Sequence, residues 1–165
     1  MTTLDILIDR LQASRRWTGN LLADIEETRW FDPPAPGAGH VAWQVGHLAA
    51  SQVVLVHTRC FDKVYTDHLS ATFRDTFGRG SKPVADPKAY PPIAEIRAEF
   101  ERIHRESIAL IAAMDPRELD APTSGDPHPM FTTKGTAIGM AALHETFHAG
   151  QIALIRRLAG KAPLR

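Results

Sequence analysis

The sequence is poor in several features that mark common protein classes. It has a single cysteine, Cys60, which excludes an internal disulfide and any cysteine-rich zinc module. No stretch approaches the ~20 consecutive apolar residues of a membrane-spanning helix. Nineteen basic and nineteen acidic side chains cancel, so composition gives no electrostatic reason to expect nucleic acid or a membrane as a partner.

The remaining composition is that of an ordinary globular protein. A length of 165 residues and a hydrophobic fraction of 44% fit one domain with one core, spanning residues 1–165. The first ten residues, MTTLDILIDR, place two aspartates inside their apolar pattern, unlike a secretory signal. We therefore expect a cytoplasmic protein, in keeping with the scarcity of cysteine.

Helical periodicity dominates the chain, and strand-like alternation is absent. Apolar residues recur every three or four positions in four segments, which predicts four amphipathic helices. The first expected helix begins after Thr3 as N-cap and ends before Pro33, and the second runs from near Gly39 to Phe61. The third follows Pro91-Pro92 and ends at Asp115-Pro116, and the fourth runs from near Thr133 to just before Gly160. The pattern indicates an all-α four-helix bundle with two long connections, residues 62–92 and 115–133.

Those connections permit a topology other than simple up-down-up-down. The first one carries a predicted short helix between Asp67 and Phe77, and a connection of this length is often functional, for example as a lid. On the fourth helix, the expected buried seam is Ala137, Met140, His144, Phe147, Gln151, Leu154 and Leu158. Arg10, Arg15 and Arg16 are interpreted as a solvated face of the first helix.

Two histidines lie one turn apart on the predicted buried side of the fourth helix. Side chains at i and i+4 are about 5–6 Å apart at Cβ, so His144 and His148 could bind one metal at ~2.1 Å each. Such a pair arises by chance about 0.4 times in a chain with this histidine content, so the spacing alone is weak evidence. The alternative is a pair of ordinary core or surface histidines.

A third histidine strengthens the metal hypothesis. His47 lies in the apolar second helix, next to Gly46, which would permit close approach of another helix. A lone histidine there is more often a satisfied core residue, but three inward histidines in one small bundle favour a metal site. A three-histidine shell leaves a coordination position open, as reactive sites do. We interpret the other five histidines, His40, His57, His68, His104 and His128, as non-ligating.

The segment HETFH also matches the H-E-x-x-H motif of zinc proteases. The metzincin continuation is missing, because Gln151 and Leu154 stand where glycine and histidine would be needed. Glu145 is therefore a candidate base or a supporting residue for the site, with an exposed helix charge as the alternative. Gln151, one turn beyond His148, could hydrogen-bond a ligand, a metal-bound water or the opposite helix. Glu145 and Gln151 are the candidate catalytic residues, because either could handle a proton in the reaction.

The segments GHLAAS and HETFHAGQIALIRRLAGK, together with the long connection ending in AYPP, resemble the DinB-like family of metal-binding four-helix bundles. The resemblance covers almost the whole chain and implies a divalent metal on His47, His144 and His148. The family is typically dimeric, so a homodimer is also implied. Some members are bacillithiol- or mycothiol-dependent S-transferases and one is a thiol-dependent isomerase, while many have no assigned activity.

Three functions are consistent with these residues. The leading hypothesis is a metal-dependent transferase, in which a low-molecular-weight thiol is activated to attack an electrophilic small molecule under the 62–92 connection. A metal-dependent hydrolase with Glu145 as base is the second, and a non-catalytic stress-related metal-binding module is the third. Zinc or nickel, manganese or iron would all suit imidazole ligands.

Overall fold

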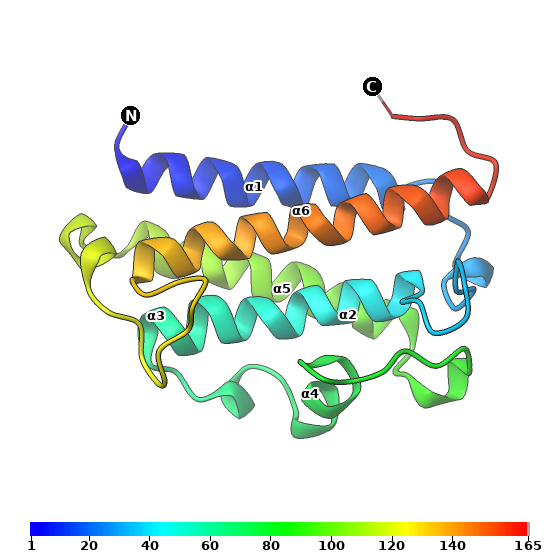
Figure 1. The fold of residues 1–165 in the computed structure, drawn as a ribbon, viewed down its shortest axis with the longest axis horizontal. Helices are drawn as coiled ribbons and strands as arrows, with labels where there is room; N and C mark the ends of the chain where they lie inside the picture. The colour runs from blue at the N-terminus through cyan, green and yellow to red at the C-terminus, as the bar shows by residue number, and fades with distance from the viewer. Residues whose placement is uncertain (165) are drawn as a thin grey trace.

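The computed structural model describes residues 1–164 and has the all-α architecture predicted from the sequence (Figure 1). Its long helices are α1 (Thr3–Leu22), α2 (Val41–Gln52), α5 (Ile93–Ala112) and α6 (Lys134–Leu158), and the short α4 (Ala71–Phe77) lies outside them. α2 continues without a break through a π-helical stretch (Val53–Thr58) into α3 (Arg59–Phe61). Within residues 1–164 there is no β-strand, only two isolated bridges, and no helix is long and apolar enough to cross a membrane.

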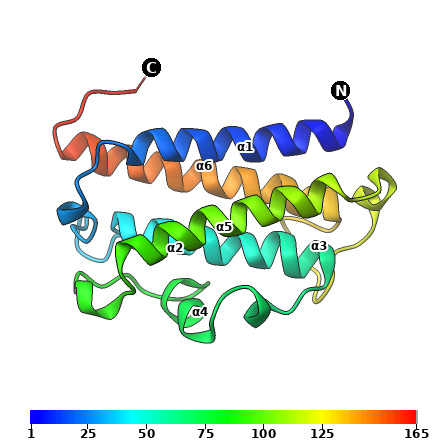
Figure 2. The same cartoon turned by 180° about the vertical axis from the view of Figure 1, so that it is seen from behind.

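The four long helices pair side by side in two layers. α1 packs chiefly on α6, and α2 chiefly on α5. In Figures 1 and 2, α1 and α6 run in one direction, while α2 and α5 both run in the opposite direction. The chain must therefore return along the whole bundle between α2 and α5, which explains why residues 62–92 form a long crossover with α4 packed on α2.

The helix ends follow the predicted capping chemistry with one correction. The N-cap of α1 is Thr2, not Thr3: the Thr2 side chain accepts a hydrogen bond from the Asp5 backbone, and Asp5 accepts one in return. Thr2 is the N-cap because a capping box pairs the cap residue with an acidic or polar residue three positions later, and Asp5 is three positions after Thr2. Thr133 caps α6 as expected.

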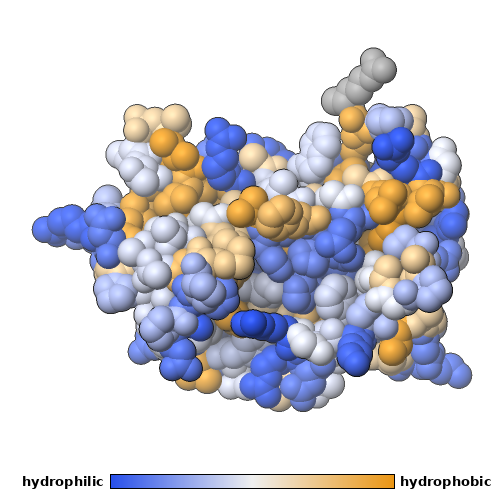
Figure 3. All heavy atoms as spheres, in the orientation of Figure 1, coloured by the Kyte–Doolittle hydropathy of each residue, from blue (hydrophilic) through white to orange (hydrophobic). Residues whose placement is uncertain are grey.

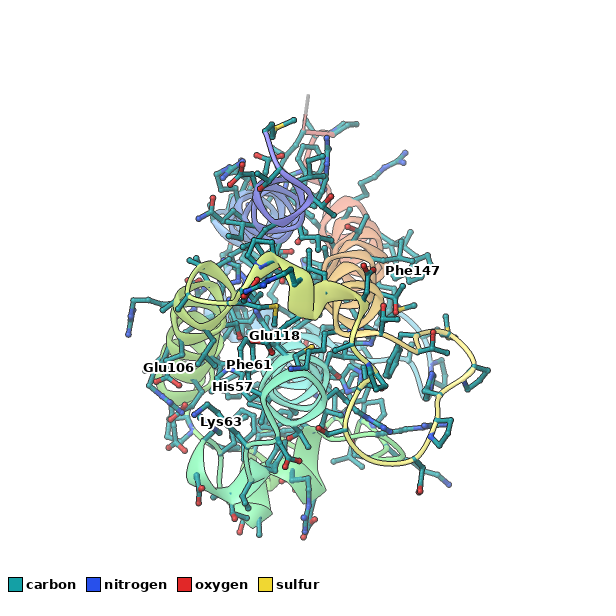
Figure 4. All side chains as sticks on the ribbon, turned by 90° about the vertical axis from the view of Figure 1, so that its left-hand side faces the viewer. His57, Phe61, Lys63, Glu106, Glu118 and Phe147 are labelled. Atoms are coloured by element: carbon teal, nitrogen blue, oxygen red, sulfur yellow. The ribbon has the colours of Figure 1, made fainter. Side chains whose placement is uncertain are left out.

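The predicted seam of α6 is wrong in part. Phe147, Leu154 and Leu158 are more than half exposed, and Figure 4 shows Phe147 pointing away from the bundle. The buried face is rotated around the helix and includes Ile138, Ala141, Glu145, Ala149 and Ile152. Both sides of α6 carry apolar residues, so periodicity did not select between them. The small residues of the buried face let α1 approach closely, and apolar side chains remain on the outer surface (Figure 3).

Candidate metal centre

The structure brings together the three histidines that the sequence singled out. His47 lies on α2, and His144 and His148 lie on the facing side of α6. One ring nitrogen from each lies within 4.8 Å of the other two. The Nε2 atoms of His144 and His148 are 3.2 Å apart. Two nitrogens bound at ~2.1 Å to one tetrahedral ion are about 3.4 Å apart, so this pair has the spacing of two ligands of one ion.

Hydrogen bonds on the far side of two rings fix their tautomers. His47 donates from Nδ1 to the backbone carbonyl of Phe77 at 2.6 Å, which leaves Nε2 as the lone-pair nitrogen. His148 likewise donates from Nδ1 to the side-chain oxygen of Gln44. The Nε2 lone pair of His148 therefore faces Nε2 of His144, an arrangement that a shared cation satisfies.

The environment keeps these imidazoles neutral. Burial, together with the neighbouring histidines, lowers the pKa of His144 to about 4 and that of His148 to about 3. Burial also lowers the pKa of His47, although the Phe77 carbonyl opposes this shift. At pH 7 all three rings are unprotonated, so a metal would not have to displace a proton from them.

Gln151 is connected to this centre through the side chain of Gln44. Its side-chain oxygen accepts a 2.8 Å hydrogen bond from Gln44, whose own oxygen binds His148. Gln44 also donates to the Gly39 carbonyl, so its amide is oriented at both ends. Sequence reasoning missed Gln44, although a polar residue three positions before His47 on a buried helix face was a usable signal. The carbonyl of Phe77 left no signal in the sequence.

Glu145 is placed elsewhere. Its carboxylate is buried and pairs with Arg15 of α1, with Nε–Oε1 at 2.8 Å. The same guanidinium donates to the Phe100 carbonyl at 2.5 Å and to Gln52 at 3.0 Å. The expectation of a solvated Arg15 is therefore wrong: its ion-pair partner lies 130 residues away in the sequence. Glu145 faces α1 and the bundle interior and is not brought to the histidines.

A pocket of about 780 Å³ opens beside the candidate metal centre, with His47 and His144 in its wall. This volume is within the range of small-molecule sites, about 300–1,000 Å³. The crossover contributes Tyr65 and residues 74–75 and 78–81, so the 62–92 connection forms part of the pocket wall. Apolar lining comes from Val54, Leu55, Met130, Phe131 and Met140, and cationic lining from Arg59, Arg74 and Arg79.

At Gly46 the crossover helix α4 packs closely against α2. A Cβ at this position would overlap the buried ring of Phe77, whose carbonyl orients His47. We expect Gly46→Ala to displace α4 and to weaken metal binding by about 10–100-fold, the usual effect of losing a partner of a metal ligand. Zn²⁺ titration checks this, with Gly150→Ala on α6 as control, because nothing lies near its added Cβ. Equal affinities for both variants would contradict it.

Comparisons with known proteins place the chain in a family. The structure resembles a crystal structure described as the conserved protein of a locus from Enterococcus faecalis, with a TM-score of 0.67 and 17% identity over 98% of this chain and 99% of that one. No curated protein matches the sequence. The model of the DinB superfamily matches residues 10–152. The chain therefore belongs to the DinB superfamily.

Proposed function

We propose that this protein is a metal-dependent transferase that joins a low-molecular-weight thiol to an electrophilic small molecule. His47, His144 and His148 would hold the divalent ion, and the pocket beside them would hold the reactants. The observation that carries the proposal is the position of the ring nitrogens: they converge at the wall of a pocket large enough for a drug-sized ligand. A cation at this position would lower the pKa of a coordinated thiol.

The surrounding residues would orient the metal ligands and contact the electrophile. Phe77 and Gln44 hold the His47 and His148 rings with Nε2 directed inward. The apolar wall formed by Met130, Phe131 and Met140 would contact the carbon skeleton of the electrophile. In the reaction the thiol loses its proton to solvent, the sulfur forms a bond to the electrophilic carbon, and the leaving group departs with the electron pair of its bond.

The placement of Glu145 favours a transferase over a hydrolase. Hydrolysis would require a base near the activated water, and the hydrolase hypothesis assigned that role to Glu145. Its carboxylate is instead held by Arg15. A thiol needs no such base, because its pKa of about 8.5 is within reach of deprotonation by a nearby cation.

Conjugation assays test the proposal. Untagged protein loaded with Zn²⁺, Ni²⁺ or Mn²⁺ is mixed with bacillithiol, mycothiol or glutathione and an aryl halide, and thioether formation is measured by mass spectrometry. We expect metal-dependent conjugation that falls with Met140→Trp, which fills the pocket, while metal content stays unchanged. No conjugate with any thiol and electrophile would overturn the activity.

A further inference from the structure

A second group of metal-ligating side chains lies outside the site described above. His57, in the π-helical stretch after α2, meets His68 of the crossover and Glu106 of α5. One ligand atom from each lies within 4.8 Å of the others. Figure 4 shows His57 between the α2–α3 helix and α5, with Glu106 beside it. The π-helical turn changes the direction of His57 relative to His47 because it adds a residue to the helical turn.

The distance between the two histidines of this cluster is that of metal ligands rather than of a strong hydrogen bond. His57 Nδ1 is 3.4 Å from His68 Nε2, while a Glu106 oxygen lies 3.5 Å from the other ring nitrogen of His68, Nδ1. Hydrogen bonds between such groups are normally about 2.7–3.2 Å long. Ligands at ~2.1 Å from a common tetrahedral ion are about 3.4 Å apart.

Two of the three ligands, His57 and Glu106, have an outer partner of the kind that metal ligands have. The Ser107 hydroxyl donates to the Ile103 carbonyl at 2.8 Å, so at 2.9 Å it accepts from His57 Nε2. This leaves the Nδ1 lone pair of the fully buried His57 directed at the cluster. Arg102 donates to Glu106 at 2.7 Å, which orients the carboxylate, and to the backbone carbonyl of His68 at 2.5 Å, which holds this part of the crossover against α5.

The charge state also suits a cation. Burial, helped by the neighbouring His68, lowers the pKa of His57 to about 4, so His57 is neutral at pH 7. Burial raises the pKa of Glu106, but the hydrogen bond and charge of Arg102, together with His68 and His57, lower it overall. Two imidazoles and a carboxylate are a donor set for Zn²⁺, Mn²⁺ or Fe²⁺.

We propose that His57, His68 and Glu106 form a second divalent-metal site, which fastens the crossover to the bundle. His68 stands three residues before α4, the helix that carries Phe77 to His47. A metal here would hold the segment that covers the pocket against α2 and α5. This proposal is independent of the transferase activity.

Metal stoichiometry separates the two sites. Untagged full-length protein is dialysed against Zn²⁺ and analysed by mass spectrometry for bound metal, with circular dichroism to confirm folding. We expect two equivalents in wild type, one in His68→Gln, one in His148→Ala and none in the double variant. His128→Ala, which removes a histidine outside both clusters, is the control and should retain two equivalents.

Ser107→Ala provides a second, milder test. It removes the partner of His57 Nε2 without removing a ligand, and it should weaken the second equivalent about 10–100-fold. The alternative occupant is a proton: His68 protonated on both nitrogens would also bridge His57 and Glu106. One equivalent in wild type and none in His148→Ala, with His68 titrating as an imidazolium by NMR, would overturn the proposal. Loss of metal in His68→Gln alone leaves the transferase proposal intact.

Discussion

His148→Ala is expected to weaken metal binding at the three-histidine centre by more than about 100-fold while the helical content of the protein is retained. Even residues that only support a ligand contribute about 10–100-fold to affinity, and His148 would be a direct ligand with a fixed tautomer. The fold should persist because the packing of α1 on α6 does not depend on this ring. Competition with a chromophoric chelator for Zn²⁺ gives the affinity.

The measurement is made in the His68→Gln background, so that the second cluster adds no signal. His128→Ala in the same background is the matched control: it also removes an imidazole from the neighbourhood of the pocket, but its ring stacks on Phe131 and is outside the cluster. Unchanged affinity in His148→Ala, with the fold intact, would show that the three rings do not share an ion.

The bundle and the three histidines could be predicted from sequence because each leaves a local signal. The periodicity of apolar residues gives the helices, and an i, i+4 spacing puts His144 and His148 on one face. His47 was identifiable as a polar residue in an apolar helix. The length of residues 62–92 already allowed the parallel arrangement of α2 and α5, since a short loop could not span the bundle.

The features that were missed depend on contacts between distant parts of the chain. The burial of Arg15 depends on Glu145, and the cluster of His57 with His68 and Glu106 depends on the π-helical turn and the path of the crossover. Neither has a sequence spacing from which it could be recognised. A backbone carbonyl such as that of Phe77, which orients His47, is invisible in sequence because every residue has one.

Glu145→Ala is expected to lower the free energy of unfolding by about 3–5 kcal/mol, because it leaves the guanidinium of Arg15 buried without its counter-ion. Urea denaturation measures this loss. Glu101→Ala on α5 is the control: Glu101 is exposed, and its replacement should change stability by less than about 0.5 kcal/mol.

The double variant Arg15→Met/Glu145→Leu should recover part of the loss, since apolar residues often replace a buried ion pair at little cost. Recovery will be incomplete, because Arg15 also satisfies the Phe100 carbonyl and Gln52. Zn²⁺ affinity should be unchanged in Glu145→Ala. The opposite result, with stability preserved and conjugation abolished, would show that Glu145 acts as a catalytic base. A carboxylate that only anchors α6 to α1 would affect the reaction only through the stability of the fold.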